Sequence, residues 1–473
     1  MMSGMLDLLR EKNAWRENAK LHSHARYGII ALGFEKGNKD MFVGREYYID
    51  ALSSLWRKAT SSLVAAVAVC ASAASAADAV RTATVKEFSG EAIQRAIDEL
   101  AEKGGGKVVV PAGSYPITCI RLRSGIELHL EKGTTLKGPT DPNMCRQFPS
   151  GKDITNVTIG MGSCLIQAWN ERDIAITGEG AIDAQGATYF DMSEADLAGR
   201  FFHPYEGVRP KIMILCRCTN ITMRGVSFLN SPSWTMRVRF CENVDIDGIK
   251  VLNDLRFINA DGIDIDASRH VRMRNSRFLT GDDSVVLRAA REPDSSEPAI
   301  TEDVLVENCE LESACQTVRV GGPSDDTIRN ATFRNIRARG HNGIRFDYPP
   351  RYLLEGDEGS MDVHDVTFEN YSGEFAGIAL QISVGSGVKL RGVRDVLFKD
   401  FNVKSAMPLQ FKGNIYTKPE RIRRVNFTFN GNLLPDGEFV ADCTDAGPLK
   451  REPRKSPNFF RRRPVAGAGA RYP

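Results

Sequence analysis

The sequence predicts an all-β fold, a single-stranded parallel β-helix (solenoid) with an N-terminal capping helix. One short pattern, apolar-x-apolar-x-x-apolar-x-apolar, recurs at intervals of roughly 22 to 35 residues through the middle of the chain. A unit this small cannot bury its apolar face alone, so neighbouring units must stack on one another. The apolar positions of the clearest copies are Ile221, Met223, Val226, Phe228; Val244, Ile246, Ile249, Val251; Val304, Val306, Cys309, Leu311; Ala331, Phe333, Ile336, Ala338; and Val396, Phe398, Phe401, Val403.

Each copy of the pattern reads as two short strands joined by a corner. Alternation of apolar and other residues is the period of a strand with one buried face, and the two consecutive non-apolar positions mark the corner. Weaker copies begin at Val271 and Val366, so the solenoid is expected to continue between the clear ones. The β-helix is predicted over residues 85–449.

The start of the solenoid and its interruptions can also be predicted. Residues 91–103 have the apolar spacing of an amphipathic helix and stop at Gly104-Gly105-Gly106, so we expect a helix that caps the open end. Segments without the repeat interrupt the coils at about 138–155, 187–210, 289–300 and 348–363. Insertions in solenoids tend to gather on one face, often the binding face.

The two ends of the chain differ from the repeat region. Arg57 and Lys58 precede an apolar run and the small residues Ala74-Ser75-Ala76-Ala77, so residues 51–77 are interpreted as a secretory signal peptide. The alternative, a buried Ala-rich helix, is disfavoured because the run has no amphipathic face. Residues 1–50 are an N-terminal extension of uncertain role, with Met41 as a candidate start. Residues 450–473 are expected to form a disordered basic tail.

Composition limits the classes of partner. The formal net charge of the 473 residues is +2, which does not favour nucleic acid, and no apolar run predicts a membrane span after signal cleavage. The signal peptide predicts a secreted or periplasmic protein, and we expect it to be a monomer. The ten cysteines show no disulfide framework. Cys216 and Cys241 are expected on adjacent coils, without a predicted bond.

Aligning the coils by their inward residues brings acidic side chains together. The aligned pairs are Met236 and Val238, Ile263 and Ile265, Val285 and Leu287, Val318 and Val320, and Ile344 and Phe346. Equivalent positions on neighbouring coils lie about 4.8 Å apart. This alignment places Asp261 beside Asp283, with Asp282 adjacent but of opposite parity. The outward positions of the same columns carry Arg237, Asp264, Arg319 and Arg345, then Asp266, Arg288 and Asp347.

Such a group of carboxylates suits acid–base chemistry. Neighbouring carboxylates repel, which raises the pKa of at least one of them, as a general acid near neutral pH requires. Glycoside hydrolysis with inversion needs one such acid and a carboxylate base about 6.5–9.5 Å away. The alternative is structural, because Asp and Asn in turn-rich solenoids also satisfy corner backbone groups.

Five segments follow one another in a recognisable order: residues 91–138, 174–186 (IAITGEGAIDAQG), 230–234 (NSPSW), 259–264 (NADGID) and 281–283 (GDD). They resemble glycoside hydrolase family 28, the polygalacturonases, and the resemblance covers about residues 88–430. It implies a right-handed parallel β-helix that hydrolyses a pectic glycosidic bond with inversion. By position, Asp282 corresponds to the general acid, and Asp261 with Asp283 to the pair that activates water. Asn259 begins the matching NADGID segment, and we expect it to bind substrate.

Departures from the family pattern concern the substrate. Asn-Thr-Asp appears as Asn259-Ala260-Asp261, and the usual Gly-His-Gly as Ala314-Cys315-Gln316. Arg-Ile-Lys appears as Arg345-Phe346-Asp347, so an acid stands where a lysine would help to grip a substrate carboxylate. Asp347 is therefore expected to shift preference away from unsubstituted polygalacturonan, unless it simply pairs with Arg288 or Arg345. Neighbouring arginines, namely Arg237, Arg288 and Arg319, are candidates to compensate in binding the acidic substrate.

Two other functional classes remain open at this point. One is a non-catalytic carbohydrate-binding β-helix, which retention of all three aspartates disfavours. The other is a polysaccharide lyase on the same architecture, which would hold Ca²⁺ on clustered Asp and use an arginine as base. The leading interpretation is an exported glycoside hydrolase of acidic polysaccharide, with no cofactor and no metal site.

Overall fold

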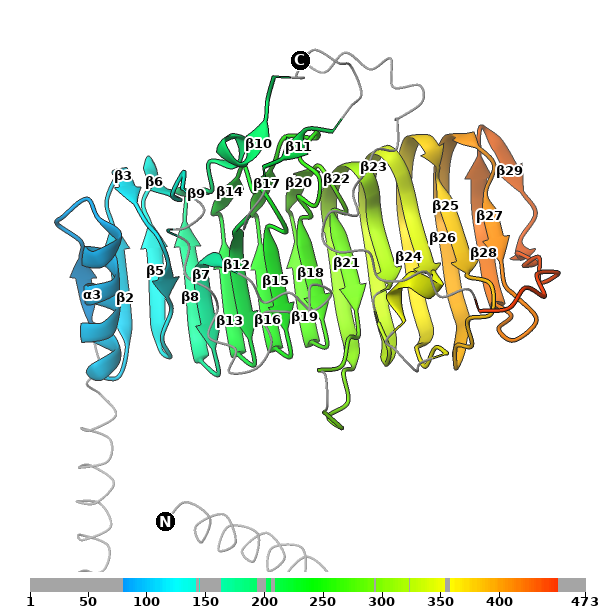
Figure 1. The fold of residues 1–473 in the computed structure, drawn as a ribbon, viewed down its shortest axis with the longest axis horizontal. Helices are drawn as coiled ribbons and strands as arrows, with labels where there is room; N and C mark the ends of the chain where they lie inside the picture. Colours follow the sequence, from blue (N-terminus) through cyan, green and yellow to red (C-terminus); the bar gives the residue numbers. More distant parts are fainter. Residues whose placement is uncertain are drawn as a thin grey trace, which may run out of the picture. The chain divides into compact units, whose positions relative to one another are not determined.

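The computed structural model describes residues 80–141, 144, 163–193, 201–205, 209–292, 295–322, 324–353 and 358–449. These residues form a right-handed parallel β-helix in which 28 strands join in one continuous sheet (Figure 1). The predicted fold class is thus confirmed. The signal peptide, the N-terminal extension and the basic tail were predicted for residues that lie outside the described ones.

The strands stack in three columns, one on each side of the coil. The first column consists of β1 (Thr82–Thr84), β2 (Gly106–Val110), β5 (Ile126–Leu130), β8 (Arg172–Gly178), β13 (Thr219–Arg224), β16 (Glu242–Asp247), β19 (Arg269–Arg274), β22 (Thr301–Gly321), β23 (Thr327–Tyr348), β24 (Asp362–Ile378), β26 (Gly392–Met407) and β28 (Glu420–Phe429). The second consists of β3 (Gly113–Pro116), β6 (Thr134–Lys137), β9 (Ala181–Asp183), β14 (Ser227–Leu229), β17 (Lys250–Leu252) and β20 (Arg277–Thr280), and continues into β22.

The third column is the one that carries the site. It consists of β4 (Ile120–Arg121), β7 (Cys164–Trp169), β12 (Lys211–Cys216), β15 (Met236–Arg239), β18 (Ile263–Asp266), β21 (Val285–Arg288), the ends of β22 and β23, β25 (Leu380–Val384) and β27 (Gln410–Lys412). Outside the columns, β29 (Asn432–Leu434) and β30 (Gly437–Glu438) pair antiparallel with β28, and β10 (Phe190–Asp191) with β11 (His203–Pro204). Two short 3-10 helices are η2 (Gly186–Tyr189) and η3 (Pro350–Tyr352).

The corners lie at the two consecutive non-apolar positions of the repeat. Asn308, Asn335 and Asn370 occupy this place with φ of 51 to 56°, a left-handed conformation that Asn tolerates better than most residues. Their side chains also bond from coil to coil: Asn335 Nδ2 donates to Asn308 Oδ1 at 2.9 Å, and Asn370 Nδ2 to Asn335 Oδ1 at 2.9 Å. Asn at the corner therefore both adopts the backbone conformation of the turn and links neighbouring coils by side-chain hydrogen bonds.

Apolar side chains fill the coil interior in rows. Phe368 stacks on Phe333 and Phe398 with ring centroids 4.9 and 5.3 Å apart, and Tyr371 and Phe401 stack beside them at 4.9 Å. Such ring pairs contribute about 0.5–1.5 kcal/mol each beyond the area that they bury. Equivalent repeat positions thus meet their own copies on the next coil.

A helix covers the N-terminal end of the solenoid, as predicted. Helix α3 (Gly90–Glu102) packs beside β2, and the Ser89 side chain caps its start by accepting a hydrogen bond from Ala92 N at 3.2 Å (Figure 1). Ile93, Ile97 and Leu100 are buried on its inner face. No helix among the described residues is long and apolar enough to cross a membrane.

Cys216 and Cys241 lie on adjacent coils, as expected, but they are not level with each other, because Cys216 pairs with Arg239. The coil neighbour of Cys241 is Cys218, whose backbone N–H donates to Cys241 Sγ at 3.4 Å. Cys216, Cys218 and Cys241 are free thiols, and Cys309 is buried in the core as expected.

Candidate active site

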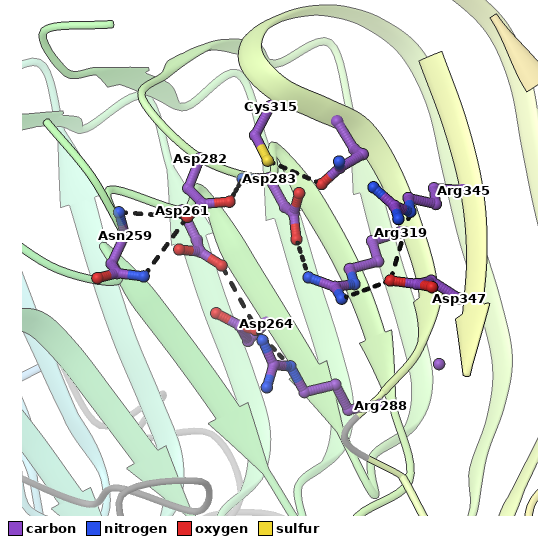
Figure 2. Close-up of polar contacts among 12 residues, drawn as sticks. Asn259, Asp261, Asp264, Asp282, Asp283, Arg288, Cys315, Arg319, Arg345 and Asp347 are labelled. Atoms are coloured by element: carbon purple, nitrogen blue, oxygen red, sulfur yellow. Dashed lines mark hydrogen bonds and ion pairs between the residues drawn. The ribbon is translucent and has the colours of Figure 1, made fainter. Parts of the chain in front are cut away.

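The predicted acidic residues come together just before two neighbouring strands of the third column. Ile263 of β18 pairs with Val285 of β21, so Asp261 is level with Asp283 on the next coil, as the alignment predicted. Figure 2 shows Asp261, Asp282 and Asp283 gathered between Asn259 and Arg319. Asp261 and Asp283 are only 3% and 1% exposed, while Asp282 is partly exposed.

A close backbone approach brings Asp282 against the loop of the preceding coil. A Cβ at Gly281 would lie 2.1 Å from the carbonyl oxygen of Phe257, so only glycine fits there. Asn259, in the same loop, has φ of 61° and directs its backbone N–H toward Asp282 Oδ2 at 3.2 Å. The glycine of the GDD segment therefore sets the distance between Asp282 and Asn259.

An inserted hairpin supports this loop. Strands β10 and β11 come from the predicted insertion at 187–210, and Phe190 stacks on Phe257 with centroids 4.5 Å apart. Arg209, at the end of the same insertion, donates from Nη1 to the carbonyl oxygens of Pro232 and Ile258, both at 2.8 Å. The loop that carries Asn259 is thus held from two sides.

Asp282 has the environment of a general acid. Burial, followed by the nearby Asp283, raises its pKa to about 7, while hydrogen bonds from Cys315 and from Asp283 N and the charge of Arg319 act in the opposite direction. Its Oδ2 accepts from Asn259 N and, at 3.5 Å, from Asn259 Nδ2; its Oδ1 accepts from Asp283 N at 3.0 Å. A carboxyl with this pKa carries a proton over much of the range below neutrality.

The other two carboxylates differ from one another. Burial, then the charges of Asp282, Asp264 and Asp283, raises the pKa of Asp261 well above its usual value. Asp283 instead forms an ion pair with Arg319, Nη1 to Oδ2 3.1 Å. Of the two residues expected to activate water, Asp283 is therefore the one with the closer arginine partner.

Asp347 lies in a cluster of arginines. It is 5% exposed, and its Oδ2 lies 3.2 Å from Arg319 Nη2, 3.3 Å from Arg345 Nε and 3.9 Å from Arg351 Nη2. Of the two pairings considered, the one with Arg345 is present. The effect of Asp347 on substrate preference stays a prediction.

The same cluster contains an aromatic ring. Tyr352 OH accepts from Arg319 Nη2 at 3.0 Å, and the guanidinium carbons of Arg319 and Arg351 lie 5.3 and 4.7 Å from the ring centroid. The side chains of Arg345 and Arg351 remain 26% and 39% exposed. We call Arg319, Arg345, Asp347, Arg351 and Tyr352 the arginine cluster.

Two predicted substrate-binding arginines are buried instead. Arg237 is 0% exposed and forms an ion pair with Asp266, which Arg239 also contacts. Burial opposes ionisation of Asp266, but Arg239 and Arg237 lower its pKa below the ordinary value. The expected substrate contact of Arg237 is therefore corrected to a buried ion pair.

Arg288 is 4% exposed and lies close to two of the acidic residues. Its Nε lies 2.7 Å from Asp264 Oδ1, in a geometry that is not a hydrogen bond, and its Nη2 lies 4.0 Å from Asp261 Oδ2. Its guanidinium carbon lies 4.6 Å from the centre of the Trp234 ring. Arg288 balances the charge of buried carboxylates, and its contact with substrate stays a prediction.

Cys315 lies beside the acidic residues of the candidate site. Burial, then the charges of Asp282 and Asp283, raises the pKa of its thiol well above 9.0. One ligand atom each of Asp282, Asp283 and Cys315 lies within 4.8 Å of the others. The two carboxylates of this group already have protein partners, since Asn259 N donates to Asp282 and Arg319 pairs with Asp283. Gln316 fits best with its amide nitrogen toward Asp283 and its oxygen toward Arg345 Nη1, 3.2 Å away.

The sequence reasoning missed Arg209, Arg351 and Tyr352. All three belong to segments that had been recognised as insertions, at 187–210 and 348–363. The signal was therefore their place on a predicted binding face, although no repeat position marked the individual residues.

Comparison with known proteins relates this part of the chain to one family. Residues 105–293 match the model of Glycosyl hydrolases family 28, a range that contains Asp261, Asp282 and Asp283. The match spans less than half of the chain, and it is similarity to this family that the comparison shows.

Individual relatives are distant. The chain is 29% identical over 208 residues to a probable polygalacturonase of Vitis vinifera, covering 42% of this chain and 40% of that protein. It is 25% identical over 353 residues to an endo-polygalacturonase of Pectobacterium carotovorum subsp. carotovorum, covering 68% and 85%. The structure of a hyperthermoactive exopolygalacturonase from Thermotoga maritima superposes with a TM-score of 0.55 at 22% identity, covering 76% of this chain and 94% of that one.

Proposed function

We propose that this protein is an exported glycoside hydrolase that cleaves glycosidic bonds of pectin or a related acidic polysaccharide with inversion. The observation that carries the proposal is the meeting of Asp261, Asp282 and Asp283 at the starts of two neighbouring strands, with one carboxyl protonated near neutrality and one ion-paired. Similarity to polygalacturonases in family and sequence supports the same reaction class.

The roles follow from the environments. Asp282, partly exposed and with a pKa of about 7, gives its proton to the oxygen of the leaving sugar. Asp283 takes a proton from the attacking water on the opposite face of the sugar ring. Asp261, buried beside both, orients the same water and shares its proton with the pair.

The charge of the substrate is proposed from the arginine cluster. Three arginines against the single acid Asp347 leave an excess of positive charge next to Asp283, and Arg345 and Arg351 keep exposed guanidinium surface. A guanidinium binds a carboxylate through two parallel hydrogen bonds, so galacturonate units fit this surface. Asp347 holds the arginines in place, since its oxygen contacts all three.

The test is an incubation with a panel of pectic fragments, including unsubstituted, methylated and mixed-backbone forms. A hydrolase yields reducing ends, and the first product formed by inversion has the anomeric configuration opposite to the substrate by NMR. Asp282→Asn is expected to lose activity by a factor on the order of 10² to 10⁴. Asp245→Asn, an outward change on β16, is the control and should retain activity.

Other results would assign a different class. Unsaturated products that absorb in the ultraviolet and disappear with a chelator would identify a lyase. Tight binding without any product would identify a carbohydrate-binding protein. Export to the periplasm or the medium and a monomeric state are further parts of the proposal, tested by fractionation of the producing cells and by light scattering of the purified protein.

A further inference from the structure

Arg209 does not form a hydrogen bond with the proposed general acid Asp282 but contacts Asn259, which does. Its Nη2 donates to Asn259 Oδ1 at 3.0 Å, while its Nη1 donates to the carbonyl oxygens of Pro232 and Ile258. The guanidinium also lies over the Phe190 ring, with its central carbon 5.5 Å from the centroid. Four contacts therefore fix the position of this side chain between the NSPSW segment and the Asn259 loop.

The contact with Asn259 decides which way the amide points. Because Oδ1 accepts from Arg209, the amide nitrogen is turned toward Asp282, 3.5 Å from Oδ2 (Figure 2). The carbonyl of Ile258, held by Arg209, immediately precedes the Asn259 backbone N–H that donates to the same oxygen at 3.2 Å. Both donors to Asp282 Oδ2 thus depend on contacts made by Arg209.

We propose that Arg209 is a positioning residue that holds Asn259 against Asp282 and so aims the proton of the general acid at the leaving-group oxygen. The inference rests on the proposed function, because it takes Asp282 as the acid. It adds a residue from the insertion to the reaction, one that no position of the coil repeat supplies.

Charge gives the proposal a second measurable consequence. The charged and titratable groups that face Asp282 are Asp261, Asp283, Cys315, Arg319 and Arg209. Burial lowers the pKa of Arg209 to about 10, partly offset by Asp261 and Asp282, so the guanidinium stays charged at neutral pH. Removing this positive charge disfavours the ionised form of Asp282, which moves the alkaline limb of the rate profile to higher pH.

The experiment compares Arg209→Gln and Arg209→Lys with wild type on a galacturonate oligomer and on 4-nitrophenyl galacturonide. If the carboxyl of Asp282 is no longer held in the right orientation, kcat of Arg209→Gln on the oligomer should fall on the order of 10- to 100-fold, with KM changed less than about threefold. The nitrophenyl substrate needs little protonation of its leaving group, so the loss there should be much smaller. Arg209→Lys keeps the positive charge but loses the two-pronged hydrogen bonding of the guanidinium. The alkaline limb of its pH–rate profile should therefore stay near that of wild type, while kcat falls.

A double variant separates positioning from general damage. In the Asp282→Asn background, Arg209→Gln should cause no further loss, because the two residues act as a unit. Asn259→Gly removes the linking amide at a φ that glycine accepts, and it should reproduce the kcat loss even if Arg209→Gln does not fold. Arg256→Gln is the matched control, since Arg256 also lies over a ring, Phe202, but pairs with Asp254 instead of Asn259; it should leave the pH profile unchanged.

An equal loss on both substrates with an unmoved alkaline limb would overturn the inference. So would a full additional loss in the Asp282→Asn background. If Asp282→Asn itself hydrolyses the oligomer like wild type, the proposed function fails and the inference fails with it. If Asp282→Asn is inactive while Arg209→Gln and Asn259→Gly behave like wild type, only the inference fails.

Discussion

The raised pKa of Asp282 predicts that removing this carboxyl stabilises the fold as it abolishes activity. The pKa is about 7 in the folded protein against 3.8 for an unperturbed aspartate. The folded state then binds the proton more tightly than the unfolded state, so stability falls as pH rises from about 4 to about 7. The ionised carboxyl is a cost to folding that an amide does not carry.

The size of the effect follows from the gap between the two pKa values. The raised pKa costs the fold up to about 4 kcal/mol at pH 8, where Asp282 is ionised in the folded state, and about 2 kcal/mol at pH 5, where folding requires the carboxyl to take up a proton. Asp282→Asn removes this cost but turns one acceptor of the carboxylate into a donor that faces existing donors, a loss of about 1 kcal/mol. The net gain is therefore about 3 kcal/mol at pH 8 and about 1 kcal/mol at pH 5.

Thermal unfolding of wild type and variant at pH 5 and pH 8, followed by circular dichroism, measures this difference. The Tm of Asp282→Asn should exceed that of wild type at both pH values, and by more at pH 8. Asp326→Asn is a control for which the expected change in stability has the opposite sign. Burial opposes ionisation of Asp326, but hydrogen bonds from Arg291, Ala299 N and Arg391 lower its pKa. A depressed pKa stabilises the fold above the unfolded value, so this variant should lose stability about equally at pH 5 and pH 8.

A Tm difference for Asp282→Asn that is the same at both pH values would contradict the assignment of a raised pKa. A variant that is less stable than wild type at pH 8 would contradict it more directly. In either case Asp282 would be ionised through the working range, and another group would have to supply the proton.

Three further predictions concern the surroundings of the acid. Arg345→Ala should weaken binding of an acidic oligosaccharide about 10- to 100-fold, and Arg345→Lys should weaken it less. Added salt should reduce the difference in affinity between wild type and variant. Equal affinity of wild type for acidic and neutral oligosaccharides would refute a carboxylate contact. Asp347→Lys should lower both Tm and activity on every pectic substrate, because it places a fourth cation among three arginines; a gain on unsubstituted polygalacturonan would show that Asp347 acts on the substrate after all. Iodoacetamide at pH 7 should not inactivate the enzyme through Cys315, because burial and Asp282 raise its pKa and leave little thiolate; rapid inactivation that Cys315→Ser abolishes would contradict this.

Much of the fold and the centre of the site followed from the sequence, because both depend on short-range periodicity. The alternation of Val304 and Val306 around a two-residue corner determines which side chains enter the coil. Once the inward residues are aligned, the parity of each strand places Asp261 level with Asp283, and the structure has this register. The period of a strand is exact enough to carry such an alignment across coils.

Only the tertiary structure decided how the outward charges are used. Arg237 and Arg345 occupy equivalent outward positions, yet Arg237 is fully buried against Asp266 while Arg345 keeps exposed surface beside Asp347. Arg209 and Arg351 lie in insertions that share no period with the coils, so nothing in the repeat indicated where their side chains reach. The solvation and ion pairing of a side chain depend on which segments pack over it, and these segments are often far apart in the sequence. A local sequence pattern does not show which segments those are.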